Sequence, residues 1–261
     1  MAFTQLERRE NGLYICRKKE FAPDGVFKQK TIDKVFSFSF DMTFGEVGEH
    51  RNHRSGGSHK RRKGEIFANT FQGKLAECAS CNLFFKYDSS LMPDFSEYGL
   101  SKWDSQDIIV NGKKISVKST KSFGNLILLE TKDWDSNGRY LPTYKSELEA
   151  GFADGGVYDY TLLIRIAPSC EDIFRKERVL FSDSIDKDRI YRLLIDVEWK
   201  YEYSGYITLD DLKAITSNDK FIIHRGEMLN GTTKMDAENY YIQVGDMRDC
   251  GELARYVFGL K

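Results

Sequence analysis

Residues 104–121 read D-S-Q-D-I-I-V-N-G-K-K-I-S-V-K-S-T-K, and this stretch decides the fold of the chain. Two short apolar runs, I-I-V and I-S-V, flank Asn111 and Gly112. Asn-Gly is the strongest short signal for a β-hairpin, because a type I′ turn needs positive φ at both central residues. We therefore predict a tight hairpin that brings Asp107, at the start of its first strand, to the same end as Lys118.

The bulk composition indicates a globular protein with a real core. The chain has 261 residues, which suits one large domain or two small ones, and 41% of them are hydrophobic. Lys+Arg 39 against Asp+Glu 40 gives a formal net charge of -1, which argues against a purely electrostatic DNA binder but leaves room for local basic surface. The first ten residues are polar, and no run approaches the roughly 18 apolar residues of a membrane span.

The cysteines favour a reducing compartment. The chain has five, an odd number without the spacing of a disulfide framework. Cys78 and Cys81 form a lone CxxC inside an apolar helical pattern, and without a second pair or nearby histidines they do not predict a zinc site. We expect a cytoplasmic protein with no membrane segment.

Hydrophobic periodicity gives the order of the elements. It predicts strands at 14–16 and 35–40, and a helix at 65–85 with one buried stripe through Phe67, Phe71 and Leu75. It further predicts strands at 125–130, 158–167, 190–203 (one long strand or a pair), 221–223 and 240–244, and helices at 143–153, 209–215 and 251–258.

This order of elements favours a mixed central β-sheet flanked by helices, in the α/β (α+β) class. We expect a single domain, 1–261, with its core at about 64–168. The remaining segments, 1–63 and 169–261, lie outside this core.

The hairpin carries the residue types that phosphodiester hydrolysis needs, which are a cation ligand, an activator of water and a positive charge for the phosphate. Asp107 is a candidate ligand for Mg²⁺, a hard cation that prefers oxygen. The backbone carbonyl of Val117 lies at a plausible second ligand position. Lys118 is the candidate to orient the attacking water or hold the phosphate.

This spacing resembles the PD-(D/E)xK nuclease superfamily, with Asp107 followed by Ser116-Val117-Lys118. The resemblance covers roughly residues 64–134 and implies a restriction-endonuclease-like core. It also implies that Asp107 and an acid on the second strand bind metal while Lys118 assists the water. Ser116 occupies that acid position, and a neutral hydroxyl is a far weaker magnesium ligand.

A compensating acid is therefore expected elsewhere. The superfamily often carries one on the helix before the hairpin, in a Gly-x-x-x-Glu context, and Glu77 follows Gly73 at this spacing. The predicted catalytic set is Asp107, Glu77 and Lys118, and whether Ser116 takes part in metal binding stays open. Glu65 is a weaker candidate. Glu130, at the end of the next strand, is interpreted as a structural cap, with contact to the metal as the lesser alternative.

A basic segment precedes the predicted helix. Residues 50–63 hold six Lys or Arg, three histidines, two adjacent glycines and no acid. The simplest interpretation is a solvated surface loop without a binding function, but the composition also suits contact with phosphate groups. The candidate DNA-binding residues are Arg51, Arg54, Lys60, Arg61, Arg62 and Lys63. The polar stretch Leu229–Lys234 could form a DNA-reading loop, but a plain turn is the favoured interpretation.

The function that we expect from the resemblance is a type II restriction endonuclease, with DNA-recognition elements in segments 1–63 and 169–261. It would hydrolyse double-stranded DNA at specific sequences, with Mg²⁺ as cofactor (Mn²⁺ as a substitute), and act as a homodimer because both strands of a palindrome are cut. A nuclease for branched or damaged DNA within the same superfamily is the first alternative. A non-catalytic DNA-binding protein whose motif has decayed at Ser116 is the second.

Overall fold

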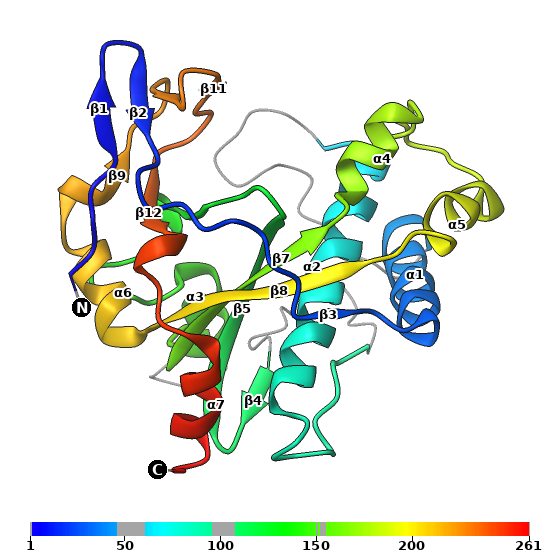
Figure 1. Cartoon of the computed structure of the whole chain (residues 1–261), viewed down its shortest axis with the longest axis horizontal. Helices are drawn as coiled ribbons and strands as arrows, with labels where there is room; N and C mark the ends of the chain where they lie inside the picture. Colours follow the sequence, from blue (N-terminus) through cyan, green and yellow to red (C-terminus); the bar gives the residue numbers. More distant parts are fainter. Residues whose placement is uncertain (1, 46–60, 96–107, 150, 152–154, 261) are drawn as a thin grey trace.

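The computed structural model describes residues 2–45, 61–95, 108–149, 151 and 155–260 (Figure 1). The helices are α1 (Gln29–Phe44), α2 (Lys63–Phe84), α3 (Leu141–Glu149), α4 (Cys170–Lys176), α5 (Lys187–Ile195), α6 (Leu209–Thr216) and α7 (Cys250–Val257). The strands are β1 (Glu7–Arg9), β2 (Gly12–Tyr14), β3 (Gly25–Val26), β4 (Ile108–Val110), β5 (Lys113–Lys121), β6 (Leu126–Glu130), β7 (Tyr160–Ala167), β8 (Lys200–Thr208), β9 (Ile222–Ile223), β10 (Met228–Leu229), β11 (Thr233–Lys234) and β12 (Asn239–Gln243).

The predicted hairpin is confirmed and forms one edge of a five-stranded sheet. The strand order is β3-β8-β7-β5-β4, and only the β5–β7 pair is parallel. Asn111 and Gly112 have φ of 47° and 75°, the positive values that a type I′ turn requires. The α/β class is therefore confirmed, although β3 and β8 come from outside the predicted core at 64–168.

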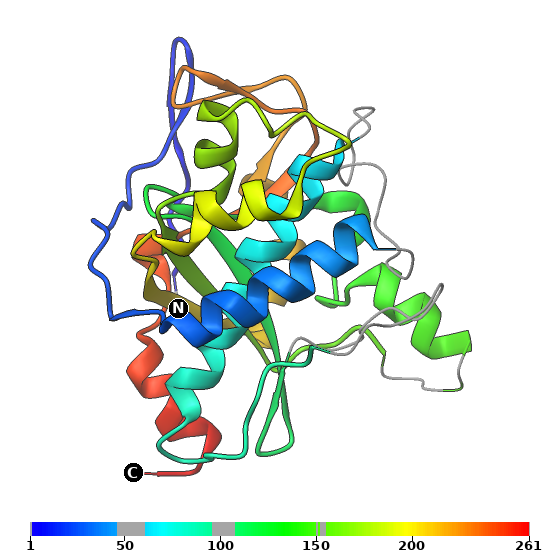
Figure 2. The same ribbon diagram turned by 90° about the vertical axis from the view of Figure 1, so that its right-hand side faces the viewer.

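Helix α2 covers one face of this sheet. The predicted stripe of Phe67, Phe71 and Leu75 is fully buried in a cluster that also contains Ile115 of β5. Val117 packs against the same cluster. Figure 2 shows α1 crossing in front of α2, so two helical layers lie on this side.

The other face of the sheet packs against a second sheet, with order β6-β12-β9. Leu163 of β7 belongs to the apolar cluster between the two sheets, and Lys118 of β5 is its partner in register. Because side chains alternate along a strand, Lys118 points away from α2 while Val117 points toward it. This alternation decides which residues share the site with Lys118.

Two predicted strands are wrong. In both segments the apolar residues are also spaced to form the buried face of a helix, and the structure has a helix there. Residues 35–40 lie in α1, whose buried Ile32, Val35, Phe36 and Ser39 follow helical spacing. The segment 190–203 begins as α5, with Ile190 and Leu194 buried one turn apart, and becomes strand β8 only at Lys200. Thr208 is the N-cap of α6, and its side chain accepts a hydrogen bond from the Asp211 amide.

Within the described ranges, no helix is both long enough and apolar enough to cross a bilayer. Cys78 and Cys81 are buried in α2, and burial raises the pKa of each thiol to about 12. Both thiols are therefore protonated at neutral pH.

Replacing Arg165 with methionine is expected to destabilise the fold by about 3–5 kcal/mol, the usual cost of leaving one partner of a buried ion pair alone. Its guanidinium is fully buried, bonds both carboxylate oxygens of Glu202 at 2.7 and 3.0 Å, and donates to the carbonyls of Lys19 and Glu20. Urea unfolding measures the change. A loss below about 1 kcal/mol, the upper range for an exposed pair, would contradict this account.

Candidate active site

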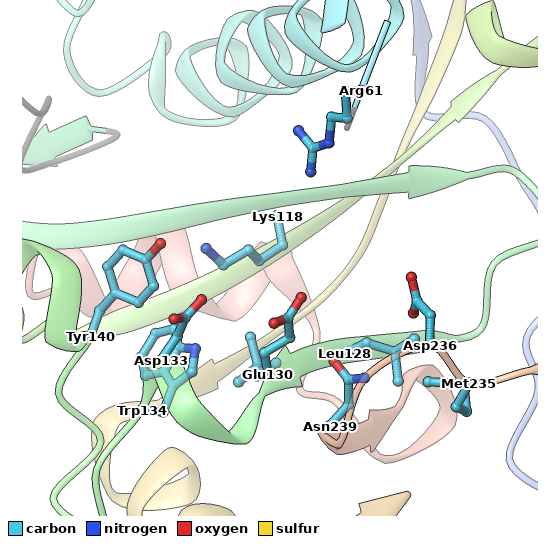
Figure 3. Close-up of a pocket in the computed structure, with 11 residues that line it drawn as sticks. Arg61, Lys118, Leu128, Glu130, Asp133, Trp134, Tyr140, Met235, Asp236 and Asn239 are labelled. Atoms are coloured by element: carbon cyan, nitrogen blue, oxygen red, sulfur yellow. The ribbon is translucent and has the colours of Figure 1, made fainter. Parts of the chain in front are cut away.

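A pocket of about 280 Å³ opens where β5, β6 and the segment before β12 meet (Figure 3). Its lining mixes both signs of charge with aromatic rings. The lining residues are Arg61, Lys118, Leu128, Leu129, Glu130, Asp133, Trp134, Tyr140, Met235, Asp236 and Asn239. Lys118, predicted from the hairpin motif, is therefore part of a recessed polar site.

The ammonium of Lys118 keeps its charge available. It lies 5.9 Å from the ring centre of Trp134 and 5.8 Å from that of Tyr140, distances at which a cation and a ring still attract. It forms no ion pair with any residue in the described part of the chain. A lysine on a strand facing several carboxylates without pairing with one of them is suited to a phosphate or a water molecule.

Glu130 ends β6 and presents a buried carboxylate to this pocket. Its side chain is 15% exposed, and its Oε2 atom is buried without a hydrogen-bond partner. The nearest cation, Lys132 Nζ, is 3.5 Å away, too far for a strong hydrogen bond. Burial raises the pKa of this carboxyl, a shift that Lys132 opposes. Lys132 therefore satisfies this oxygen only weakly, and the oxygen is a candidate to contact a cation bound in the pocket.

The rest of the donor set is also oxygen. Asp133 belongs to the 3-10 turn Thr131–Asp133, Asp236 precedes β12, and Asn239 starts it. Figure 3 shows the carboxylates of Asp133 and Glu130 directed toward the side of the pocket on which Lys118 lies. These ligand types suit Mg²⁺. Among the described residues, however, no three His, Cys, Asp or Glu side chains converge closely enough to hold a metal.

Asp107, the predicted first metal ligand, lies outside the described residues. Its sequence neighbour Ile108 pairs with Ile115, three residues before Lys118. The assignment of Asp107 stays a prediction.

The other two hairpin residues do not line the pocket. Ser116 is 1% exposed and shares the face of Lys118, whereas Val117 packs against the apolar cluster on the α2 side. The predicted contributions of the Ser116 hydroxyl and the Val117 carbonyl to metal binding stay predictions.

The structure does not bring Glu77 into the pocket with Lys118. Glu77 lies on α2, which covers the opposite face of the sheet, and its carboxylate forms an ion pair with Lys74. Lys74 in turn donates to the Asp94 carbonyl at 2.7 Å and lies 4.7 Å from the Phe38 ring. These contacts give Glu77 a role in fixing residues 91–95 on the helix, and its role as a metal ligand stays a prediction.

The basic segment is described only in part. Arg51, Arg54 and Lys60 lie outside the described residues. Arg61 lines the pocket, so one predicted DNA-binding residue lies beside Lys118. Of the other two, Arg62 forms an ion pair with Asp183, and the Lys63 ammonium lies 5.5 Å from the ring centre of Phe44.

Sequence reasoning missed Asp133 and Asp236 as members of this site and weighed a metal contact by Glu130 only as the lesser alternative. Glu130 was interpreted as a strand cap, although an acid directly after the apolar run L-I-L-L is a signal for a polar group held at a buried strand end. Asp236 had no such signal, since it reaches the pocket only because β12 pairs with β6.

Comparison with known proteins adds no relative. No family model matches the chain, and no match to it was found among curated proteins or solved structures.

Proposed function

We propose that this chain is a Mg²⁺-dependent endonuclease that hydrolyses double-stranded DNA. One observation carries the proposal: Lys118 lines a recessed pocket together with the Glu130 carboxylate, whose buried Oε2 atom has a weak partner in the Lys132 ammonium 3.5 Å away. This arrangement supports metal-assisted phosphodiester hydrolysis, which needs anionic oxygens for a cation and a cation for the anionic transition state.

The roles follow from the position of each group. Glu130, with Asp107 as the expected second ligand, would hold Mg²⁺, and Asp133 or Asp236 would complete the shell directly or through water. The bound ion would polarise the scissile phosphate and lower the pKa of a water molecule. Lys118 would orient that water and neutralise developing charge. Arg61, on the wall formed by the start of α2, would bind a phosphate oxygen.

The proposed substrate class is duplex DNA cut at specific sites, as in type II restriction enzymes. Much of the chain lies beyond the strands that build the pocket, and this surplus suits elements that grip and read a duplex. If each chain contributes one active site, cutting both strands of a palindrome calls for a two-fold dimer. A nuclease for branched or damaged DNA is the alternative within this chemistry.

The test is digestion of phage DNA by the wild-type protein with Mg²⁺ and with EDTA. We expect discrete fragments with Mg²⁺ or Mn²⁺ and intact DNA with EDTA. Cleavage of four-way junctions but not of plain duplex would support the alternative. Binding of DNA that EDTA does not affect, without cleavage in either metal, would indicate a non-catalytic binding protein.

A further inference from the structure

Two hairpins together form a projecting element that we call the arm. It consists of β1–β2 (residues 7–14) and β10–β11 (residues 228–234). Their strands make one four-stranded sheet in the order β1-β2-β10-β11. In Figure 1 the arm stands at the end of the molecule opposite α7. No step of the proposed reaction uses it.

Hydrogen bonds join the two hairpins of the arm to each other, and apolar residues anchor the arm on the body of the protein. The Asn230 amide donates to the Leu13 carbonyl at 2.7 Å, and the Asn230 side chain accepts from the Ile15 amide at 3.2 Å. Leu13 and Leu229 are buried in the cluster between the two sheets. The β10–β11 turn is therefore fixed in position, which is a requirement for reading a rigid partner.

The outer strand of the arm leads directly into the pocket. β11 is an edge strand, and both of its residues, Thr233 and Lys234, are exposed. The next residues, Met235 and Asp236, line the pocket. At about 3.3 Å per residue, Lys234 lies within about 7 Å of Asp236 along the chain. A phosphate bound in the pocket would therefore bring the adjoining groove of its duplex to β11.

The shape and chemistry of this ribbon fit a DNA groove. The major groove of B-DNA is about 12 Å wide and admits a two-stranded β-ribbon. Because β10 is also paired with β2, only the outer edge of the arm, formed by β11 and the β10–β11 turn, is free to enter such a groove. Thr233 offers a hydroxyl that donates and accepts, its methyl group suits contact with thymine, and Lys234 suits guanine or a phosphate. Arg225, just before β10, is also exposed.

We propose that the β10–β11 ribbon enters the major groove beside the scissile phosphate and contributes to sequence recognition. This inference rests on the proposed function, because the pocket fixes where the DNA backbone lies. It assigns Thr233 to base contact and Lys234 to the backbone or a guanine edge.

The experiment compares Thr233→Val and Lys234→Ala with wild type and with a matched control, Lys213→Ala, which removes a half-exposed lysine from α6. Cleavage sites are first mapped on phage DNA. Affinity is then measured by fluorescence anisotropy, in Ca²⁺ without cleavage, for a duplex that contains a mapped site and for a scrambled duplex. Thermal melting of each variant verifies folding.

We expect Thr233→Val to reduce the preference for the mapped site about tenfold, from the loss of one base contact, with little change on the scrambled duplex. Lys234→Ala should weaken binding and lower the slope of log Kd against log salt by about one, whereas Lys213→Ala should not. If wild type cuts DNA and both arm variants match it in affinity, preference and fragment pattern, the arm inference is overturned and the nuclease proposal stands. If wild type neither binds nor cuts DNA, both fail.

Discussion

Replacing Lys118 with alanine is expected to lower the single-turnover rate of DNA cleavage by about 10²–10⁴-fold, the usual contribution of a positioned group that assists proton transfer or neutralises charge. The reason is the setting of the ammonium, which lies in the pocket without an ion-pair partner among the described residues. Few other contacts depend on it, so folding should be unaffected. The rate is measured on phage DNA with enzyme in excess and saturating Mg²⁺.

The control for Lys118→Ala is Lys213→Ala, which also removes one lysine but lies on α6 and outside the pocket. It should give the wild-type fragment ladder at the wild-type rate. If Lys118→Ala melts like wild type and still cuts within about threefold of its rate, Lys118 is not catalytic. The hairpin is then a structural element only.

Replacing Glu130 with glutamine is expected to remove stabilisation of the fold by Mg²⁺. At ten times its Kd, a ligand that binds only the folded state adds RT ln 11, about 1.4 kcal/mol. For a chain of this size that raises Tm by roughly 3–6 °C. Wild type should show this rise by calorimetry, and Glu130→Gln should not. The same variant should cleave DNA at least about 10²-fold more slowly, because the cation is no longer held.

Acidification should weaken Mg²⁺ binding in the wild type. Burial raises the pKa of Glu130, and a protonated carboxyl does not bind the cation, so affinity is lost as pH falls through this raised pKa. Without metal the sign is opposite. Ionising a buried carboxyl costs stability, and that cost grows as pH rises through the folded-state pKa, so Glu130→Gln should gain stability relative to wild type over this range.

Two matched variants separate a metal site at Glu130 from other effects of charge removal. Glu198→Gln changes an exposed, lysine-paired carboxylate outside the pocket and should keep the full Mg²⁺ response. Glu77→Gln tests the other predicted ligand, and we expect it to lower stability by stranding the buried Lys74 ammonium while the Mg²⁺ response remains. Loss of that response in Glu77→Gln alone would move the metal site to α2.

Local signals predicted the parts of the fold that local chemistry decides. The Asn-Gly turn fixed the hairpin register from Ile108↔Ile115 to Val110↔Lys113, and the aromatic stripe placed α2 to within two residues at its start. Lys118 could be predicted as a site residue for the same reason, since the alternation of side chains along β5 determines the face on which it lies. These features depend on residues close in sequence.

The remaining site residues depend on pairing between distant segments. Asp236 reaches the pocket because β12 pairs with β6, more than a hundred residues apart, and periodicity carries no information about such pairing. The predicted position of Glu77 depended on which side of the sheet α2 covers, which helical periodicity alone does not decide. The strand predicted at residues 35–40 was wrong for a different reason. Their alternating apolar pattern is also compatible with a helix that buries side chains against two neighbours, and α1 packs on both α2 and α5.

Iron-directed cleavage of the polypeptide tests most directly whether the pocket of Lys118 and Glu130 holds the catalytic metal. Fe²⁺ takes the place of Mg²⁺, and hydroxyl radicals made there with ascorbate and peroxide cut the backbone nearby, so mass spectrometry of the fragments maps the site. We predict cuts around 118, 130–133 and 236 that excess Mg²⁺ suppresses and that Glu130→Gln lacks. Mg²⁺-sensitive cuts centred on Glu77, with none at these three positions, would contradict the account.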